Sequence, residues 1–282
     1  MKRGEPEGAA RNRREVRSHY NQRGKKPRDD ATVNLRAWNN CFKAGLIEDF
    51  TSKGSVVADL GAGRGGDLLK YDATHVSTIY HVDDAEGVIA EAQSRHVRQG
   101  LRSKLVTIRA GMQDQLPIPS ASCDAVFTQF SFHYVWGSRE QVEATLDTIG
   151  RVLKKGGTWI CTTMDKGVLY DSPLHHRGEA VPWRGDVAFG PARLTMDSED
   201  HVFGTEVRVT LGTALVDCPE FLVDPDSMKA LARERGLQLC NTVPFTDMDP
   251  NHPRCRKMRV RPLSDADARA AGMYCAYVFL KE

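Results

Sequence analysis

Strand-like and helix-like patterns of hydrophobic and polar residues alternate along the chain. The clearest helical pattern covers residues 33–50, where Trp38, Phe42 and Leu46 recur every four positions and share one helix face. The strand-like segments are short apolar runs bounded by glycine or polar residues. The predicted strands are residues 55–60, 76–82, 104–110, 122–127, 158–163, 202–211, 237–243 and 274–280. The predicted helices are residues 33–50, the segment from 67 onward, 86–98, 139–153 and 225–235.

This alternation predicts an α/β protein built on a parallel, doubly wound sheet. The order is interrupted at about residues 164–218, which contain proline, glycine and histidine and then one strand-like stretch. We therefore predict a β-containing insertion after the fifth strand. We expect residues 1–28 to form a basic N-terminal arm and residues 29–282 to form the domain that carries the insertion.

The formal net charge of +2 conceals an uneven distribution. Residues 1–28 contain ten Lys or Arg against three Glu, which gives +7 and leaves −5 for the rest of the chain. Blocks of like charge attract phosphate groups. We expect the arm to be flexible, and a solvated tail without a binding role is the alternative interpretation of its first residues. A second basic cluster near the C-terminus comprises Arg254, Arg256, Lys257, Arg259 and Arg261.

The remaining composition excludes several classes of protein. The apolar runs are too short for a membrane-spanning helix, and no apolar stretch typical of a secretory signal follows the N-terminal charges. The seven cysteines are odd in number and lack the spacing of a zinc site. We therefore expect reduced thiols in an intracellular protein, with no metal site.

A glycine-rich turn is the first candidate binding element. Gly61, Gly63 and Gly66 lie between a predicted strand and a predicted helix, and glycines there allow close approach of a ligand to the backbone. Asp83 ends the next strand, where a carboxylate can bind both ribose hydroxyls of an adenosine. This pattern alone fits NAD, FAD or S-adenosylmethionine.

Two features favour S-adenosylmethionine over a dinucleotide. Asp59 lies inside the strand before the turn, where its carboxylate suits the ammonium group of the methionyl end. Residues 57–63 (VADLGAG) resemble the first motif of S-adenosylmethionine-dependent methyltransferases, and residues 153–158 (LKKGGT) resemble their turn before the fifth strand. An oxidoreductase is the less favoured alternative.

Several strings together resemble one family, the mRNA cap guanine-N7 methyltransferases. The resemblance extends from about residue 18 to the C-terminus and depends on the combination of strings, since each could occur by chance. They are residues 35–43 (LRAWNNCFK), 65–70 (GGDLLK), 129–134 (QFSFHY) and 218–223 (CPEFLV).

The resemblance implies a Rossmann-like, mostly parallel sheet of seven strands and S-adenosyl-L-methionine as cofactor. It implies transfer of a methyl group to N7 of the guanine in the GpppN cap of mRNA. The implied partner is 5′-capped RNA, with other capping enzymes or an activating subunit as possible further partners. We expect a monomer in the nucleus, or in the cytoplasm if the chain comes from a virus that replicates there. Methylation of another small acceptor and a non-catalytic RNA-binding subunit are the alternatives.

The resemblance also assigns roles residue by residue. It places Lys43 at the methionyl carboxylate, Asp59 at the methionyl end and Asp83 at the ribose. The residues implied to bind the cofactor are Lys43, Asp59, Gly61, Asp83, Gln129 and Tyr134. The residues implied to bind the cap and its triphosphate are Asn39, Arg64, Lys70, Arg95, Phe130, His133, Tyr134, Glu220 and Tyr274.

The chemistry of guanine explains the absence of an acid–base constellation. N7 has a free lone pair at neutral pH, so the in-line displacement needs no general base, and positioning and electrostatics must supply the rate. Guanine presents two donors, N1–H and the N2 amine, which one carboxylate can accept, and Glu220 is the candidate. We predict no catalytic acid or base, with positioning by His133, Tyr134 and Glu220.

Simpler structural roles compete with several of these assignments. Lys43, Lys70 and Arg95 could be surface charges, and His133 a buried core histidine. Asp67 could cap the helix that follows it or contact a ligand. Tyr277 competes with Tyr274 for the cap pocket.

Two positions depart from the family pattern. Gly111 stands where an acidic residue usually contacts the adenine amine, and the nearby Asp114 is a candidate substitute. Met164 stands where a proline usually lies against the cap, and its soft apolar side chain can pack on a base.

Overall fold

A seven-stranded sheet forms the centre of the computed structural model, which describes residues 15, 32–171, 185–189, 192–196, 201–211 and 215–282. The strand order is β10-β11-β5-β4-β1-β2-β3, and β11 alone runs antiparallel to its neighbours. The predicted Rossmann-like, mostly parallel sheet is therefore confirmed. The strands are β1 (Val56–Leu60), β2 (Thr78–Asp83), β3 (Lys104–Arg109), β4 (Cys123–Gln129), β5 (Leu153–Met164), β10 (Leu237–Pro244) and β11 (Tyr274–Lys281).

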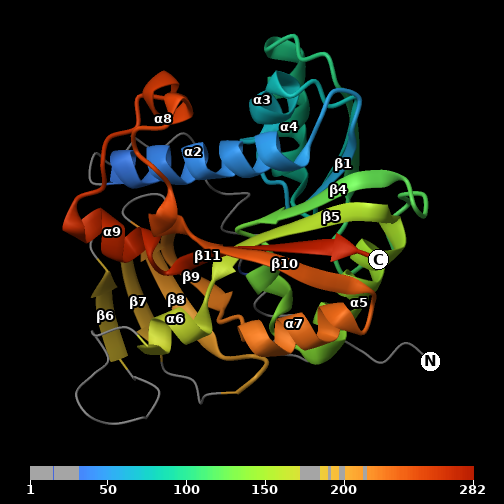
Figure 1. Ribbon diagram of the computed structural model, residues 1–282. Coiled ribbons are helices and arrows are strands. Elements are labelled where there is room, and N and C mark those ends of the chain that lie inside the picture. The colour runs from blue at the N-terminus through green and yellow to red at the C-terminus, as the bar shows by residue number, and fades with distance from the viewer. Residues whose placement is uncertain (1–14, 16–31, 172–184, 190–191, 197–200, 212–214) are drawn as a thin grey trace.

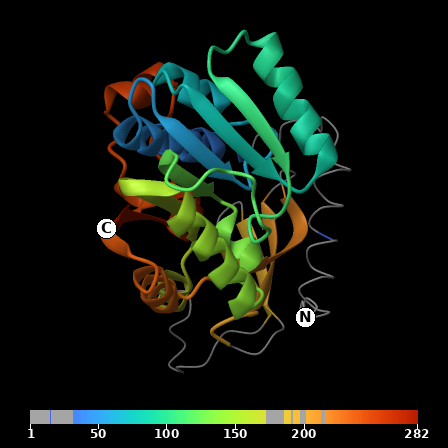
Figure 2. The ribbon, with the colours of Figure 1, turned by 90° about the vertical axis from the view of Figure 1, so that its right-hand side faces the viewer.

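Helices cover both faces of this sheet, so its central strands are apolar on both sides. In β1, the side chains of Val57, Ala58 and Leu60 are fully buried, and Asp59 lies among them. Figures 1 and 2 show α4 and α5 on opposite sides of the strands. Helices α2 (Val33–Phe50), α3 (Leu68–Ala73) and α4 (Glu86–Arg98) cover one face, and α5 (Arg139–Val152) and α7 (Pro225–Arg233) cover the other.

The apolar periodicity of α2 buries one of its faces against the core. Leu35, Trp38, Phe42 and Leu46 are buried there, and the Trp38 indole Nε1 donates a 2.7 Å hydrogen bond to the carbonyl of Phe245. This bond joins the start of the domain to the connection between β10 and β11. The predicted helix over residues 33–50 is confirmed at both ends.

The insertion forms a second, antiparallel sheet. Its strand order is β6-β7-β8-β9, and an isolated bridge between Asp165 and Val223 joins its far end to the end of β5. The sheet continues three residues past the predicted boundary at 218, so Glu220 belongs to its last strand. The strands are β6 (Gly185–Phe189), β7 (Ala192–Met196), β8 (Glu206–Leu211) and β9 (Leu215–Phe221).

The other differences from the predicted elements concern short segments. β5 begins at Leu153 rather than at 158, because Leu153 already pairs with Cys123 of β4, ahead of a register shift and the regular pairing that starts at Thr158. The helices that the sequence pattern did not predict are α6 (Lys166–Asp171), α8 (Pro253–Lys257), α9 (Asp265–Ala271), η2 (Phe132–Val135) and η3 (Phe245–Asp247).

Most of the basic N-terminal arm lies outside the described residues. Glu15 is described, and it forms a 2.9 Å ion pair with Arg208 of β8. No described helix is long and apolar enough to cross a membrane. The described residues contain no group of three metal-ligating side chains.

Candidate active site

The glycine turn after β1 adopts a backbone conformation that favours glycine. Gly61, Gly63 and Gly65 have φ angles of 72°, 60° and 72°, in the left-handed region. A Cβ at residue 61 would lie 2.4 Å from Cβ of Ser131, so the turn also packs too closely against the loop after β4 for a side chain. This close packing fixes the turn at the carboxyl edge of the sheet.

Asp83 connects this turn to the end of β2. Its carboxylate accepts hydrogen bonds from the backbone N–H of Gly63 at 2.9 Å and of Ala85 at 3.0 Å. Burial raises the pKa of Asp83 above its usual value, although these two bonds oppose the shift. Two accepted bonds leave lone pairs on both oxygens for a diol.

Asp59 is the second buried carboxylate at this edge. Burial, followed by the negative charge of Asp67, raises its pKa to about 7. A cation placed beside Asp59 would favour its charged form. The residue therefore fits the ammonium group that the sequence predicted for it.

Asp67 binds both lysines that were predicted to contact ligands. Lys43 Nζ lies 2.8 Å and Lys70 Nζ 2.6 Å from its carboxylate oxygens. Burial alone would raise the pKa of Asp67, but the two ammonium groups hold it well below its usual range. Asp67 occupies the N-cap position of α3 without a side-chain capping bond, so it acts as a counterion rather than as a cap.

The other two predicted triphosphate contacts share one counterion as well. Arg64 and Arg95 both form ion pairs with Glu91, the Arg95 pair at 3.3 Å. Both arginines are partly buried beside the glycine turn, where Arg95 also donates to the carbonyl of Gly65 at 3.3 Å. The structure therefore brings these two cations together.

Two site residues, in addition to His133, have buried side-chain polar atoms without a hydrogen-bond partner in the described part of the chain. They are Asn39 of α2, at Oδ1, and Gln129 of β4, at both amide atoms. Unpaired buried polar groups are costly and rare in native proteins. A ligand that offers them hydrogen bonds would remove this cost, as the sequence predicted for both residues.

Aromatic rings form one wall of the site. The ring centroid of Phe130 lies 5.0 Å from that of Tyr274 and 5.3 Å from that of Phe245, both edge-on. Phe130 has a φ of 54°, an unusual conformation for a bulky residue that is concentrated at functional sites. The ammonium of Lys43 lies 5.8 Å from the centroid of Phe130, so this wall borders the lysine pair.

Phe245 was not singled out from the sequence. Its ring stacks on Phe42 of α2 at 4.0 Å, a contact between residues 203 positions apart. The one available signal was an aromatic residue two positions after the end of the strand predicted over residues 237–243.

His133, Tyr134 and Glu220 meet beside this wall, as predicted. The Tyr134 hydroxyl donates a 3.3 Å hydrogen bond to Glu220, and His133 Nε2 lies 3.5 Å from the other carboxylate oxygen without the geometry of a hydrogen bond. Burial raises the pKa of Glu220 to about 8 and lowers the pKa of His133 to about 3. A carboxyl group and a neutral imidazole thus face one another in a buried site.

The structure places Tyr274 and Tyr277 in different surroundings. The Tyr277 side chain is fully buried, and its hydroxyl donates to the carboxylate of Asp165. Tyr274 lies next to Phe130 instead. Tyr274 therefore belongs to the aromatic wall and Tyr277 to the sheet interior.

The structure also locates the two positions that depart from the family pattern. Asp114 accepts a 2.7 Å hydrogen bond from the backbone N–H of Gly111, so its carboxylate folds back on its own turn. Met164 is fully buried in the apolar core and pairs with Tyr274 across β5 and β11. It therefore lies beside Tyr274, at the end of the aromatic wall.

Sequence comparison places this chain among proteins of one kind. A family model described as the mRNA (guanine-N(7))-methyltransferase domain matches residues 4–281. The chain is 28% identical over 298 residues to the mRNA cap guanine-N(7) methyltransferase of Schizosaccharomyces pombe, covering 94% of this chain and 81% of that protein. It is 29% identical over 254 residues to the Saccharomyces cerevisiae enzyme of the same name, covering 82% of this chain and 58% of that protein.

Comparison with solved structures agrees on the fold. The geranyl diphosphate C-methyltransferase of Streptomyces coelicolor superposes with a TM-score of 0.59 at 12% identity, covering 99% of this chain and all of that one. A likeness at this identity shows the fold alone. The family match extends over nearly the whole chain and includes every residue of the site described above, and the chain therefore belongs to the mRNA (guanine-N7) methyltransferase family.

Proposed function

We propose that this chain transfers a methyl group from S-adenosyl-L-methionine to N7 of the guanine in the GpppN cap of mRNA. The observation that carries the proposal is the meeting of Glu220, His133 and Tyr134 beside an aromatic wall. Glu220 comes from β9 of the second sheet, whereas His133 and Tyr134 come from η2, which follows β4 of the central sheet. A planar, donor-rich base beside a nucleoside-binding turn is the ligand that this arrangement suits.

The cofactor residues at the turn fit S-adenosyl-L-methionine, which supplies an electrophilic methyl group when bound. Asp83 has lone pairs free for the ribose hydroxyls, and Asp59 is a carboxylate whose charged form an ammonium group would favour. Lys43 would bind the methionyl carboxylate, and the amide of Gln129 would gain a partner. Gly61 leaves the turn free of a side chain, and Tyr134 borders both ligands.

Guanine recognition belongs to Glu220. Its carboxylate accepts the N1–H and N2 donors of the base, and its negative charge stabilises the cationic N7-methyl product. Phe130 and Tyr274 offer aromatic faces or edges for packing against the base, and stacking of this kind contributes about 1–3 kcal/mol. His133 supports the same edge as a neutral donor or acceptor.

The reaction requires no proton transfer from the protein. The lone pair of N7 attacks the methyl carbon directly, so the side chains have only to align the two reactants and exclude water. A histidine with a pKa of about 3 cannot act as a general acid near neutral pH. The site therefore works by positioning.

The four remaining polar residues would bind the triphosphate. Asn39 has an unpaired buried oxygen, and Lys70, Arg64 and Arg95 are cations beside the turn. Each cation now has a carboxylate partner, so the phosphates must compete with Asp67 and Glu91. Phosphate competes well for arginine because it accepts two parallel hydrogen bonds.

The proposal is tested by transfer of a labelled methyl group to RNA that begins with GpppG. Digestion of the product should release labelled 7-methylguanosine, and calorimetry should show binding of both S-adenosylhomocysteine and GpppG. Cofactor binding without GpppG binding would instead indicate another acceptor. Binding of neither would contradict the proposal.

A further inference from the structure

Four exposed cations occupy six residues at and after the short helix α8. Arg256, Lys257, Arg259 and Arg261 are exposed, and none has a carboxylate partner within the part of the chain that the structure describes. Arg254 of the same helix differs, since it is partly buried and bound to Glu48, with Nε at 2.7 Å from the carboxylate. The cluster therefore divides into one structural arginine and four unpaired cations.

Elsewhere on the domain, arginines are commonly matched with acids. Arg102, Arg139 and Arg235 each form an ion pair, with Asp72, Glu143 and Asp147 respectively. Four neighbouring cations without such partners repel one another, and only Arg256 and Lys257 lie in the last turn of α8, where the helix dipole favours a positive charge. Their charge is available to an external anion.

The backbone at Arg259 is a second, independent observation. Arg259 follows the end of α8 with a φ of 55°, in the left-handed position that helices usually give to glycine. A non-glycine residue there is strained, and such strain is concentrated at functional positions. This conformation ends α8 and leaves the Arg259 side chain exposed.

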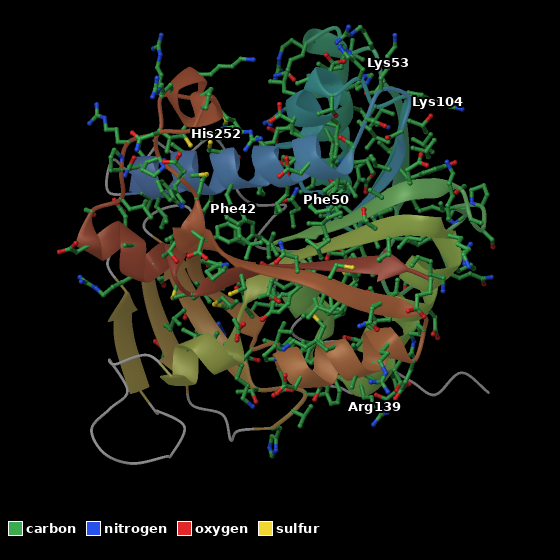
Figure 3. The ribbon with its side chains drawn as sticks, viewed as in Figure 1. Phe42, Phe50, Lys53, Lys104, Arg139 and His252 are labelled. Carbon is green, nitrogen blue, oxygen red and sulfur yellow. The ribbon has the colours of Figure 1, made fainter. Side chains whose placement is uncertain are left out.

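The four cations share a connection with one residue of the candidate active site. They lie on the connection between β10 and β11, which begins with Phe245 of the aromatic wall. Helix α8 packs on α2, the helix that carries Asn39 and Lys43, through a 3.2 Å contact between Cys255 Sγ and Cys41 Sγ. Figure 1 shows α8 lying directly over α2, and Figure 3 shows His252, which caps α8, far from Lys53 and Lys104.

We propose that Arg256, Lys257, Arg259 and Arg261 bind backbone phosphates of the RNA that follows the cap. This inference rests on the proposed function, because it requires a capped RNA in the site. Flexible cations bind phosphates without reading sequence, as a cap enzyme acting on many transcripts requires. The segment has one exposed large apolar residue, Met258, which is little for the apolar core of a protein–protein interface.

The test compares two variants of the full chain with equal charge loss. One carries Arg256→Gln, Lys257→Gln, Arg259→Gln and Arg261→Gln. The control carries Lys53→Gln, Arg98→Gln, Lys104→Gln and Lys155→Gln, which neutralise four exposed cations at the opposite, amino edge of the parallel strands. Both are assayed for methylation of free GpppG and of a capped 20-nucleotide RNA at several salt concentrations.

The α8 variant should methylate free GpppG like the wild type, but its KM for capped RNA should rise by about tenfold or more. The slope of log affinity against log salt should become shallower by about 3, from about 0.7 for each phosphate contact on a single strand. The control should change neither value by comparable amounts. Equal KM values and slopes for wild type and α8 variant would overturn the proposal and leave an acidic protein as the alternative partner.

A single substitution separates charge from folding. Arg259→Gly removes one cation and relieves the left-handed strain, so its Tm should be unchanged or higher while its salt slope falls by about 0.7. An unchanged slope, or a lowered Tm, would contradict the argument. Failure of the wild type to methylate GpppG would refute the proposed function itself, which is a different outcome from failure of this inference.

Discussion

At the scale of single residues, the proposed function makes Glu220 the group whose protonation decides recognition of the guanine. Its pKa of about 8 means that at pH 7 about one molecule in ten carries the charged form that accepts both guanine donors. Binding of the base must therefore release a proton. The free energy for that release comes from the charge-assisted hydrogen bonds that guanine donates.

We therefore predict that affinity for GpppG rises with pH. Between pH 6 and pH 8 the dissociation constant should fall by up to about tenfold per unit and then level off above the pKa. Calorimetric titration across this range measures it, and Glu220→Gln, which cannot ionise, should bind weakly and without this dependence. A flat profile in the wild type would contradict the assignment.

The same shift has a consequence for stability of the opposite sign. Because folding raises the pKa of Glu220 from 4.5, the folded protein holds this proton more tightly than the unfolded chain. The contribution of this residue to stability is therefore greatest below pH 4.5 and is lost as pH rises towards 8. Burial of Glu220 therefore does not stabilise the fold near neutral pH, and its proposed role in binding the base explains its position.

Asp67 is the residue whose role the sequence left open between a cap and a ligand contact. Its contacts with two lysines predict that Asp67→Asn destabilises the fold by about 3 kcal/mol, because two partly buried ammonium groups lose their counterion. Urea unfolding measures this loss. Addition of Lys70→Met to that variant should restore part of the stability, and a double variant as unstable as the single one would refute the pairing argument.

At the scale of elements, the glycine turn shows how closely backbone conformation and packing combine. A Cβ at residue 61 meets Ser131 at 2.4 Å, whereas a Cβ at residue 63 meets nothing within 4 Å, although both residues have positive φ angles. The two glycines are therefore required for different reasons. One avoids a collision and a strained conformation, and the other avoids the strain alone.

The pair Gly61→Ala and Gly63→Ala separates these reasons. Gly63→Ala should lower the free energy of unfolding by about 1 kcal/mol, the cost of a left-handed alanine, while Gly61→Ala should lose clearly more. Only Gly61→Ala should also disturb the adjoining loop and weaken S-adenosylhomocysteine binding by more than tenfold. Equal losses in stability for the two variants would show that the loop carrying Ser131 can move away from the added Cβ at little cost.

The sequence predicted the long elements well and the short ones poorly. Strands of the central sheet are apolar on both faces, and α2 has a regular apolar face, so local pattern alone locates them. Helices of five to seven residues such as α8 and α9 carry too few turns for a periodicity. Strand β9 was not predicted, because it pairs with β8 through contacts that no local pattern reveals.

The candidate site divides in the same way. Residues within a motif, such as Asp83 after the glycine turn and Tyr134 after β4, could be proposed as site residues from sequence alone. The counterions Asp67 and Glu91 could not be assigned, because each ion pair depends on the tertiary positions of both partners. Phe245 was missed for the same reason.

At the scale of the whole molecule, the charge distribution matters more than its sum. The arm of residues 1–28 carries +7, and the rest of the chain carries −5. Within that acidic remainder, the cations at and after α8 form a local exception. A protein of nearly neutral total charge can therefore still present phosphate-binding segments to RNA.

Deletion of residues 1–28 tests the arm. We predict a shallower salt dependence of RNA binding with methylation of free GpppG nearly unchanged, because the arm attracts phosphates and the cap site does not require it. Loss of the ion pair between Glu15 and Arg208 should change stability by at most about 1 kcal/mol. Equal salt slopes with and without the arm would contradict this division of roles.

The central claim is that Glu220 recognises the guanine whose N7 is methylated. The most direct test measures methyl transfer to RNA capped with GpppG and to RNA capped with the inosine analogue, which lacks the N2 amine, using wild type and Glu220→Ala. The wild type should place the label on N7 and prefer guanosine by about tenfold to a hundredfold in kcat/KM, as expected for one charge-assisted hydrogen bond of about 1.5–3 kcal/mol. Glu220→Ala, still folded, should lose at least about a hundredfold on GpppG and most of the preference. A Glu220→Ala enzyme that keeps the wild-type preference for guanosine would contradict the account.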